Sequence, residues 1–272
     1  MLKRLFFGKG KVSNVISKPS DIVLSKSDCD ISDNNSVFSV IREYRPDVVI
    51  NCAAKTNLEF CQDNKLLSYN SNTLGPANII DACSKFKAKL IHISSGCLFD
   101  GNDFISYEDT VPAPAVWYTR TKLWADEYIQ NFGYENYLIL RPRQLISKVS
   151  HNSNMITKFS KMKSIKAIDE KNSLTCIEDF GEMIDHLIET DSVGIFNCCN
   201  TATITPYDIA IKIKNHINND LIVEKISYQD LLEILPNKRV NTILSCDKLI
   251  SSGFTPRSAT DALDWCLENY GR

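Results

Sequence analysis

Short apolar runs alternate with longer amphipathic segments over the first half of the chain. Strands are predicted for the apolar runs LKRLFF (2–7), DIVLS (21–25), DVVINCAA (47–54), KLIHIS (89–94) and YLILR (137–141). Helical spacing covers residues 36–44, 72–87 and 118–132. Runs that are apolar on both faces are typical of parallel strands covered on two sides. The alternation therefore predicts an α/β fold with a Rossmann-like, doubly wound parallel sheet.

The alternation becomes irregular after Pro142. Helical patterns are found at 152–163, 178–190 and 205–217, and a last helix is expected to finish at residue 270; strand patterns are found at 194–200 and 221–226. Thr205 is the expected N-cap of its helix, with Pro206 at the first position. We expect residues 1–145 to form the sheet domain, with segments near 175–200 and 245–255 returning to it. Residues 146–272 should form mainly a smaller lobe over the carboxyl ends of the strands, where such folds bind ligands.

Composition narrows the class of protein. The chain has 272 residues, of which 43% are hydrophobic and 24% charged, with a formal net charge of −2, so a nucleic-acid partner is not expected. No apolar run is long enough for a membrane span. The apolar stretch within the first ten residues is too short for a signal peptide. A cytoplasmic location is therefore expected. The ten cysteines form no C-x-x-C pair and the four histidines lie far apart, so we expect buried free thiols and no metal.

The first strand is followed by a turn that could bind a dinucleotide. Gly8 and Gly10 permit a tight turn and the close approach of a pyrophosphate, and Lys11 and Val12 belong to the same predicted cofactor site. We expect the helix after the turn to offer free amide groups at its N-terminus. Ser13 stands where a third glycine would complete the motif. An ordinary glycine turn is the alternative.

The end of the second strand bears on the choice of cofactor. Sites specific for NAD often carry an acidic residue there, which binds the ribose hydroxyls. Here the strand ends Ser25-Lys26-Ser27, and an ammonium suits a 2′-phosphate better. The sequence thus favours NADPH, with NADH left open as a second cofactor. The alternative is that Lys26 is simply a solvated lysine of a turn.

Tyr118 and Lys122 are the strongest candidates for proton chemistry. Their spacing places them one turn apart on one face of a predicted helix. A nearby ammonium would lower the tyrosine pKa from about 10, so that the pair could supply a proton to an alkoxide. Ser95 lies one strand unit earlier, where a strand gives way to a loop.

These features together resemble a known family. Gly8 with Gly10, NCAAKT (51–56), Ser95, and Tyr118 with Lys122 resemble the extended short-chain dehydrogenase/reductases. RPDVVINCAAKTNLEFCQ (45–62), SSGCLFDG (94–101) and RVNTILSCDKL (239–249) are similar to the dTDP-4-dehydrorhamnose reductase branch of that family. The resemblance covers nearly the whole chain. Gly96-Cys97 departs from the Asp-Tyr that is usual in these reductases.

The resemblance implies roles for the candidate residues. Ser95 would bind the substrate carbonyl, Tyr118 would be the general acid, and Lys122 would hold the nicotinamide ribose and tune Tyr118. The implied contacts with the dinucleotide are Asp30 and Ile31 near the adenine, and Ala53, Ala54 and Lys55 along its length. The implied substrate is a nucleotide-linked 4-keto-6-deoxy sugar, bound by the lobe of residues 146–272, while residues 1–145 bind NADP. The sequence leaves the oligomeric state open, and a homodimer is compatible with it.

Cys97 suggests a second activity. A cysteine two residues after the catalytic serine resembles GDP-fucose synthase and the plant-type UDP-rhamnose synthase, which are epimerase/reductases. A thiolate can remove the acidic hydrogens next to a ketone, and an acid on the opposite face must return a proton. The stretch NSNMITKFSKM (152–162) resembles a segment of the bifunctional rhamnose enzymes and points to Lys158 as that acid. The alternatives are a buried loop cysteine and a surface lysine.

The sequence therefore predicts a bifunctional 3,5-epimerase/4-reductase that converts UDP-4-keto-6-deoxy-D-glucose to UDP-L-rhamnose with NADPH. Two alternatives remain open at this point. The first is a monofunctional dTDP-4-dehydrorhamnose reductase. The second is a non-catalytic, reductase-like regulatory binding subunit, against which the intact Ser95, Tyr118 and Lys122 set argues. The choice between UDP and dTDP is not decided by the sequence.

Overall fold

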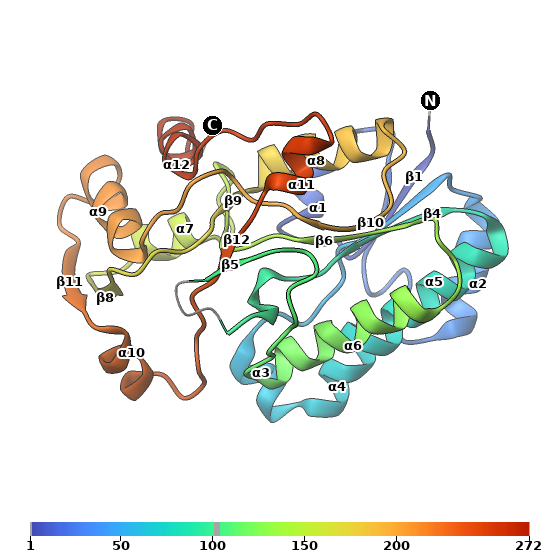
Figure 1. The fold of residues 1–272 in the computed structure, drawn as a ribbon, viewed down its shortest axis with the longest axis horizontal. Coiled ribbons are helices and arrows are strands. Elements are labelled where there is room, and N and C mark those ends of the chain that lie inside the picture. The colour runs from blue at the N-terminus through green and yellow to red at the C-terminus, as the bar shows by residue number, and fades with distance from the viewer. Residues whose placement is uncertain (1, 101–103, 272) are drawn as a thin grey trace.

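A six-stranded parallel sheet lies at the centre of the computed structural model, which describes residues 2–100 and 104–271 (Figure 1). The strand order is β10-β6-β4-β3-β1-β2. The strands are β1 (Arg4–Phe7), β2 (Ile22–Leu24), β3 (Val48–Asn51), β4 (Lys89–Ile93), β6 (Tyr137–Arg141) and β10 (Gly194–Asn197). The predicted Rossmann-like, doubly wound parallel sheet is confirmed.

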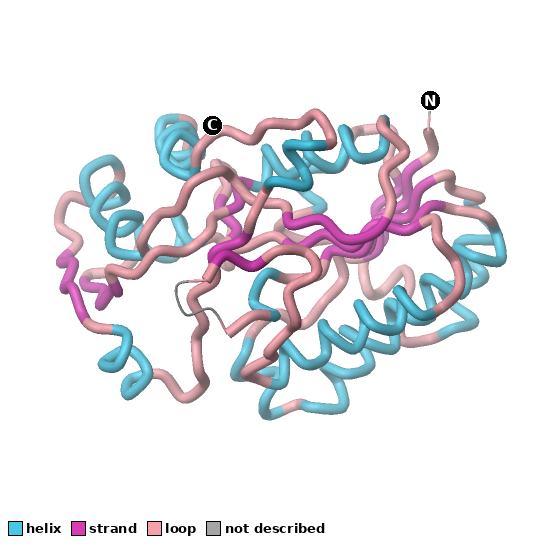
Figure 2. Tube along the Cα trace, in the orientation of Figure 1, coloured by secondary structure: helices cyan, strands magenta, loops and turns pink. Residues whose placement is uncertain are grey.

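Helices cover both faces of this sheet (Figures 1 and 2). Successive side chains of a strand point to opposite faces, so Leu5 and Phe7 enter one core and Phe6 enters the other. The first core is covered by α2 (Asn34–Tyr44), α5 (Gly75–Phe86) and α6 (Trp117–Asn131). The second core is covered by α1 (Ser13–Ile16), α8 (Ile177–Glu189) and α11 (Asp247–Ser251). This two-sided burial explains why the strands read as continuous apolar runs.

A smaller lobe lies beside the sheet, at the left of Figure 1. Its elements are α7 (Met155–Ser160), β8 (Ser164–Ile168), α9 (Pro206–His216), β11 (Ile222–Ile226), α10 (Tyr228–Ile234) and α12 (Ala259–Glu268). The predicted cap is confirmed, since the Thr205 side chain accepts a hydrogen bond from the backbone of Asp208 at 3.0 Å. Strand β8 was not predicted, and it pairs in parallel with β11.

Several elements differ from the prediction at their ends or were not expected. Helix α7 starts at Met155 because Asn154 caps it, so it is shorter than residues 152–163. Strand β10 ends at Asn197, three residues before the predicted end. Besides β8, the elements not predicted are the helices α3 (Leu58–Asp63), α4 (Lys65–Tyr69), α10 and α11, a π-helical turn (Asn70–Leu74), a 3₁₀ turn (Gly96–Leu98), and the two short parallel pairs β5 (Ile105–Ser106) with β12 (Ile243–Leu244) and β7 (Leu145–Ile146) with β9 (Thr175–Cys176).

Candidate active site

Two adjoining cavities lie at the carboxyl ends of the central strands. Strand β1 pairs with β2 on one side and β3 on the other, so the chain changes direction across the sheet at this point, where α/β folds bind ligands. The larger cavity, about 540 Å³, is lined by the predicted residues Gly8, Gly10, Lys11, Val12, Ala53, Ala54, Ser95, Cys97, Tyr118, Lys122 and Lys158. The smaller, about 430 Å³, is lined by Gly8, Lys26, Asp30, Ile31, Ala53, Ala54 and Lys55. The structure thus brings all the predicted site residues to one continuous region.

The turn after β1 is built around Gly8. This residue has a φ of +93°, and a Cβ there would lie 2.5 Å from the backbone nitrogen of Ala53. Gly10 differs, because a Cβ on it would meet nothing within 4 Å among the described atoms, so its open face is toward the cavity. Ser13 fills the place of the third glycine and ties the turn together. Its hydroxyl donates to the Gly8 carbonyl at 2.8 Å and accepts from the Gly10 amide at 2.8 Å.

The expected helix N-terminus after this turn is only partly present. Helix α1 has four residues, Ser13–Ile16, and the Gly10 amide is already bonded to Ser13. A dipole contribution from so short a helix is small. The prediction that the N-terminus of this helix offers free amide groups to a pyrophosphate stays a prediction for the amides of Lys11 and Val12. The positive charge near the turn comes instead from Lys9 and Lys11, which line the cavities.

The far cavity carries the charges expected from the end of β2. Lys26 and Asp30 both line it, and they form an exposed ion pair with 3.2 Å between Nζ and Oδ2. Ser32 donates to Asp30 and lowers the pKa of that carboxyl, with a smaller contribution from Lys26. Lys26 therefore lies at the cavity, but its ammonium is paired with the carboxylate of Asp30.

Ser95 and Cys97 occupy the 3₁₀ turn that follows β4. The Ser95 hydroxyl caps this turn by accepting a hydrogen bond from the Cys97 amide at 3.1 Å. A Cβ at Gly96 would come within 2.7 Å of Leu244 Cδ1, so glycine is what lets the turn pack against the residues near β12. The turn is thereby held with the side chains of both residues on the cavity wall.

Tyr118 and Lys122 lie on the first two turns of α6, and both are buried. Burial is the largest influence on Tyr118 and raises its pKa well above 10, with the neighbouring Cys97 acting in the same direction. Lys122 is not among the groups that lower it, so the prediction that Lys122 would lower this pKa is wrong. Lys122 Nζ points instead to the Ile93 carbonyl at 2.7 Å and to His92 at 3.1 Å. Burial lowers the pKa of Lys122 to about 8.

Arg143 contacts the cavity residue Cys97, and the sequence analysis missed it. Its Nη1 donates to Cys97 Sγ at 3.1 Å, and its Nη2 is bonded to the Val240 carbonyl. The guanidinium therefore lies between the 3₁₀ turn and the segment that leads to β12. The sequence did carry one sign of this role. In RPR (141–143), Arg143 follows closely after the end of a predicted parallel strand, where ligand-binding residues are expected.

Lys158 and Lys11 bring two amines to the same wall of the larger cavity. Lys158 projects from α7 of the smaller lobe, and Lys11 Nζ lies 3.3 Å from the Ser153 carbonyl. Burial, followed by the charge of Lys158, lowers the pKa of Lys11 to about 8. Two amines at the junction of sheet and lobe would attract a phosphate-bearing ligand.

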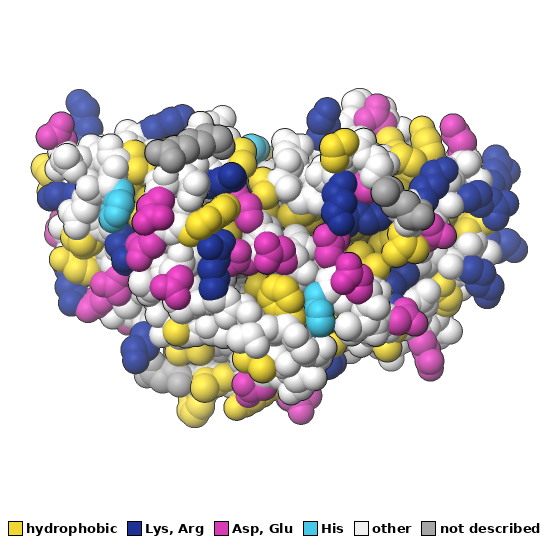
Figure 3. All heavy atoms as spheres, turned by 90° about the horizontal axis from the view of Figure 1, so that it is seen from above, with side chains coloured by type: hydrophobic (Ala, Val, Ile, Leu, Met, Phe, Trp, Pro, Cys, Tyr) yellow, Lys and Arg dark blue, Asp and Glu magenta, His cyan; other side chains and the backbone are white. Residues whose placement is uncertain are grey.

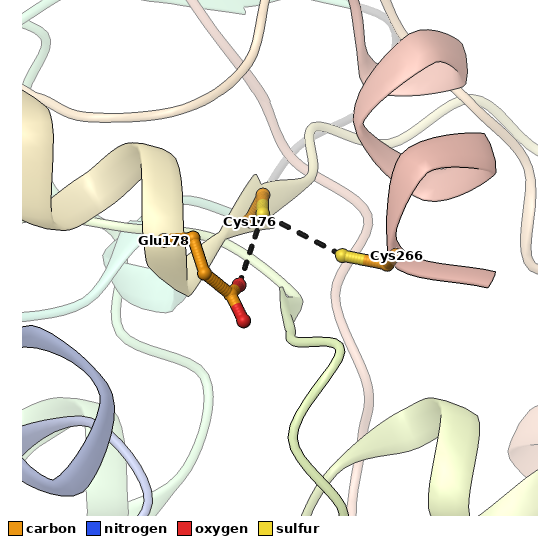
Figure 4. Close-up of side chains that lie close together, drawn as sticks. All are labelled: Cys176, Glu178 and Cys266. Carbon is orange, nitrogen blue, oxygen red and sulfur yellow. Dashed lines mark hydrogen bonds between the residues drawn. The ribbon is translucent and has the colours of Figure 1, made fainter. Parts of the chain in front are cut away.

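A separate group of possible metal ligands lies where β9 and the start of α8 meet α12 of the smaller lobe, and none of its three residues lines either cavity. Cys176 Sγ is 3.6 Å from Cys266 Sγ and 3.2 Å from Glu178 Oε2 (Figure 4). The guanidinium of Arg257 approaches the Cys176 thiol at 3.8 Å and brings a positive charge to the same place. That charge opposes a metal cation, and the expectation that the protein uses no metal stays a prediction.

The face of the molecule seen in Figure 3 is not dominated by one sign of charge. Acidic and basic side chains are interspersed over the side of the molecule seen in Figure 3. Within the described residues, no helix combines the length and apolar character needed to cross a bilayer. All ten cysteines are free, and eight of them are buried.

Comparison with known proteins assigns the family. Residues 13–271 match the family model described as the RmlD substrate binding domain. The chain belongs to this family. Its members include dTDP-4-dehydrorhamnose reductases, which agrees with the resemblance found in the sequence motifs.

Individual relatives share the fold along almost the whole chain. The bifunctional dTDP-4-dehydrorhamnose 3,5-epimerase/dTDP-4-dehydrorhamnose reductase of Arabidopsis thaliana is 25% identical over 231 residues, which is 80% of this chain and 75% of that protein. The dTDP-4-dehydrorhamnose reductase of Bacillus anthracis, solved in complex with NADP, is 24% identical, with a TM-score of 0.89 and 99% of both chains covered. The L780 UDP-rhamnose synthase of Acanthamoeba polyphaga mimivirus is 24% identical, with a TM-score of 0.86 over 98% of this chain and 99% of that one.

Proposed function

We propose that this protein is an NADPH-dependent 4-keto reductase of nucleotide-linked 6-deoxy sugars and also a 3,5-epimerase, converting UDP-4-keto-6-deoxy-D-glucose to UDP-L-rhamnose. The observation that carries the proposal is the position of Ser95, Cys97, Tyr118 and Lys122 on the wall of one cavity. A reductase needs Ser95, Tyr118 and Lys122, and an epimerase needs in addition a base such as Cys97. Family membership and the similarity to a bifunctional relative support the same function.

The two adjoining cavities fit a dinucleotide with a 2′-phosphate. Gly10 leaves open space at its Cα, into which a pyrophosphate could approach, and Lys9 and Lys11 stand beside it. The smaller cavity has room for the adenosine, with Lys26 at its edge to pair with the phosphate. NADPH, when bound, supplies the hydride. The NADP complex of the Bacillus anthracis relative supports this cofactor.

In the proposed reduction, Ser95 and Tyr118 bind the oxygen of the carbon 4 ketone. Burial keeps Tyr118 in its phenol form near neutral pH, so the residue has a proton to give. As hydride reaches carbon 4, the phenolic proton passes to the new alkoxide oxygen, and a hydroxyl and a phenolate result. The ammonium form of Lys122 then stabilises that phenolate.

In the proposed epimerisation, the same oxygen carries the charge of an enolate. The Cys97 thiolate removes a proton from the carbon next to the ketone, and Ser95 and Tyr118 stabilise the enolate oxygen. The ammonium of Lys158 returns a proton to the opposite face, which inverts the carbon. The guanidinium of Arg143, whose Nη1 lies 3.1 Å from Cys97 Sγ, would form a charge-assisted hydrogen bond with the sulfur during this step.

The proposal assigns tasks to the two parts of the chain. Residues 1–145, with the returning segments, would bind the cofactor, and residues 146–272 would mainly bind the sugar nucleotide. The position of Lys158 on α7 supports this division, because that helix brings the smaller lobe to the cavity wall. A cytoplasmic location and a homodimer remain part of the proposal.

A monofunctional dTDP-4-dehydrorhamnose reductase is the second candidate. The similarity to the Bacillus anthracis reductase, with a TM-score of 0.89, favours a monofunctional reductase. The similarity to the bifunctional relatives favours the epimerase/reductase to the same degree. Incubation with UDP- or dTDP-4-keto-6-deoxyglucose and NADPH, followed by NMR of the product sugar, separates the two. Rhamnose from the unepimerised substrate supports the bifunctional enzyme. Reduction confined to the pre-epimerised sugar supports the monofunctional one, and no NADPH turnover with any of these sugars contradicts both.

A further inference from the structure

His92 is a fully buried residue in contact with Lys122. It lies on β4, and both of its ring nitrogens face a partner. Nδ1 is 3.1 Å from Asn51 Nδ2, and Nε2 is 3.1 Å from Lys122 Nζ. Burial holds the pKa of His92 well below its ordinary range, so the ring is neutral and carries one proton. The question is which nitrogen carries it.

Asn51 decides the position of that proton. Its Oδ1 accepts a hydrogen bond from the backbone amide of Ala53 at 3.1 Å. Because a backbone amide can only donate, the oxygen of the Asn51 side chain must lie on that side. The amide Nδ2 then faces His92 and donates to Nδ1. A neutral ring whose Nδ1 accepts must carry its proton on Nε2.

The Nε2–H group points at the amine of Lys122. An ammonium has three donors and no lone pair, so it cannot accept this hydrogen bond, whereas the neutral amine can. Lys122 also donates to the Ile93 carbonyl at 2.7 Å, which leaves the lone pair of the neutral amine free for His92. The His92 Nε2–H group therefore has an acceptor if Lys122 is neutral, and two donors oppose each other if Lys122 is charged.

Four other titratable or charged groups face this site. Asp126, one turn further along α6, favours the ammonium, and its Oδ1 lies 4.0 Å from His92 Nε2. The charge of Asp126 is shared with Arg141, whose Nε is 3.5 Å from Oδ2. The thiol of Cys52 and the phenol of Tyr118 remain protonated near neutral pH, because burial raises the pKa of each, that of Cys52 to about 12.

We propose that Asn51 and His92 are positioning residues that set the protonation state of Lys122. Asn51 locks His92 in the Nε2–H tautomer, and this N–H group stabilises the neutral amine against the ammonium. The kinetic consequence rests on the proposed reductase function, in which the charged lysine supports the Tyr118 phenolate. Reductase activity should then fall on the alkaline side of neutrality, earlier than an ordinary lysine would dictate. The tautomer itself does not depend on the proposed function.

The tautomer can be measured without any enzymatic assay. In protein labelled with ¹⁵N-histidine, the side-chain nitrogen shifts distinguish a protonated ring nitrogen from an unprotonated one. The signals of His92 are those that disappear in His92→Gln. We expect an unprotonated Nδ1, a protonated Nε2, and no titration between about pH 5 and pH 9. A proton on Nδ1, or a ring that titrates in this range, overturns the proposal.

Asn51→Asp tests the effect on Lys122. The aspartate can still accept from Ala53, but its second oxygen accepts from His92 where the amide donated. The proton therefore moves to Nδ1, and Nε2 becomes an acceptor for the Lys122 ammonium. The alkaline limb of the kcat/KM profile with a 4-keto sugar should move up by about one pH unit or more. An unchanged limb contradicts the proposal.

The new carboxylate also attracts the ammonium through space, so a second background is needed. His92→Phe keeps a ring but removes both nitrogens. The ring then forms no hydrogen bond with residue 51 or with Lys122, so a change at residue 51 no longer alters a hydrogen bond to Lys122. In the His92→Phe background, Asn51→Asp should move the alkaline limb of the kcat/KM profile by less than half of the shift that it causes when His92 is present. This difference is expected because residues 51 and 92 act on Lys122 as a coupled pair. An equal shift in both backgrounds overturns the relay through His92. Absence of all reductase activity in the unaltered enzyme would instead contradict the proposed function and leave the NMR result standing.

Discussion

Tyr118 and Cys97 face the same cavity but have opposite tasks in the proposed chemistry. Tyr118 is a proton donor, and its burial keeps the phenol protonated until the alkoxide forms. Cys97 is a base, and it is the less enclosed of the two, next to the guanidinium of Arg143. Substitutions at these two residues should therefore separate reduction from epimerisation.

Tyr118→Phe should lower the rate of NADPH oxidation by about 10²–10⁴-fold, because the ring alone has no proton to give. Cofactor affinity, measured by quenching of protein fluorescence on titration with NADPH, should change little. Tyr128→Phe is the matched control, since Tyr128 lies on the same helix, is 46% exposed and does not line either cavity. Turnover at the level of the unaltered enzyme in Tyr118→Phe would remove this residue from the mechanism.

Cys97→Ser should abolish epimerisation and spare reduction, because a serine hydroxyl is not a useful base near neutral pH. In deuterated water without NADPH, the unaltered enzyme should exchange hydrogen at carbon 3 or carbon 5 of the 4-keto sugar, and the variant should lose most of this exchange. Reduction of a pre-epimerised sugar should survive. NMR of the sugar measures both outcomes.

Lys158→Ala should show a related loss of exchange, and Lys161→Ala is its control, because Lys161 is exposed and lies outside the cavity wall. If Cys97→Ser exchanges the sugar hydrogens at the normal rate, the Cys97 thiol is only a packed loop residue and not the base. No exchange in the unaltered enzyme, together with reduction of the pre-epimerised sugar, would make the protein a monofunctional reductase.

Lys26→Asp should reduce the preference for NADPH over NADH. Loss of a charged hydrogen bond to the 2′-phosphate would cost about 1.5–3 kcal/mol, which is roughly 10–100-fold in the ratio of kcat/KM values. The substitution also places a carboxylate beside Asp30, which adds to the repulsion of a phosphate. Lys85→Asp, at an exposed position on α5, should leave the ratio unchanged. An unaltered enzyme that prefers NADH would contradict the assignment of Lys26.

The residues that could be predicted from the sequence are those with a local signal. Tyr118 and Lys122 are four residues apart on a helix, and Ser95 ends an apolar strand. Arg143 reaches Cys97 across 46 residues of sequence, and no local spacing indicates such a contact. The raised pKa of Tyr118 was missed for a related reason, since it is caused by burial in the folded protein, which the spacing of Tyr118 and Lys122 does not indicate.

At the scale of the element, the turn after β1 packs closely against the segment that follows β3. Gly8 lets the backbone of the turn approach Ala53, which follows β3, while Ser13 closes the turn from within. Long apolar strands were predicted well because burial on both faces leaves a continuous pattern. The two-residue strands, such as β9 and β12, were not, because their existence depends on pairing with distant segments.

Gly8→Ala and Gly10→Ala should fail in different ways. Alanine at position 8 meets both a left-handed backbone, which costs about 1–3 kcal/mol, and a contact of 2.5 Å with Ala53, so the melting temperature should fall by several degrees. Alanine at position 10 has space, so the melting temperature should hold while NADPH affinity falls. Calorimetry and fluorescence titration measure the two effects. Unchanged NADPH affinity in Gly10→Ala would show that the cofactor does not approach this turn.

At the scale of the whole molecule, the packing of both lobes encloses most of the thiols. Eight of the ten cysteines are buried, and the two partly exposed ones, Cys52 and Cys97, both line the larger cavity. Burial raises the pKa of Cys52 to about 12, so its thiolate is scarce. The pattern of thiol reactivity therefore reports on the integrity of the fold and on the occupancy of the cavity.

The native protein should react rapidly at one thiol with a chromogenic disulfide reagent at about pH 8, because the reagent attacks thiolates that it can reach. Denaturation should release all ten. Cys97→Ser should lack the rapid phase, and NADPH with a sugar nucleotide should slow it in the unaltered protein. Rapid reaction of several thiols in the native state would contradict the enclosed packing described above.

The return of α8 and β10 to the sheet bears on how the protein is made. When the ribosome has completed β6, the sheet face that carries Phe6, Ile50 and Leu140 still lacks α8, its main cover. Each such side chain left in water forgoes about 1.5–3 kcal/mol of burial. The N-terminal half therefore emerges with an apolar face unprotected for some 40–50 residues of further synthesis, several seconds at typical elongation rates. A chaperone that holds apolar segments during translation would be most needed in that interval.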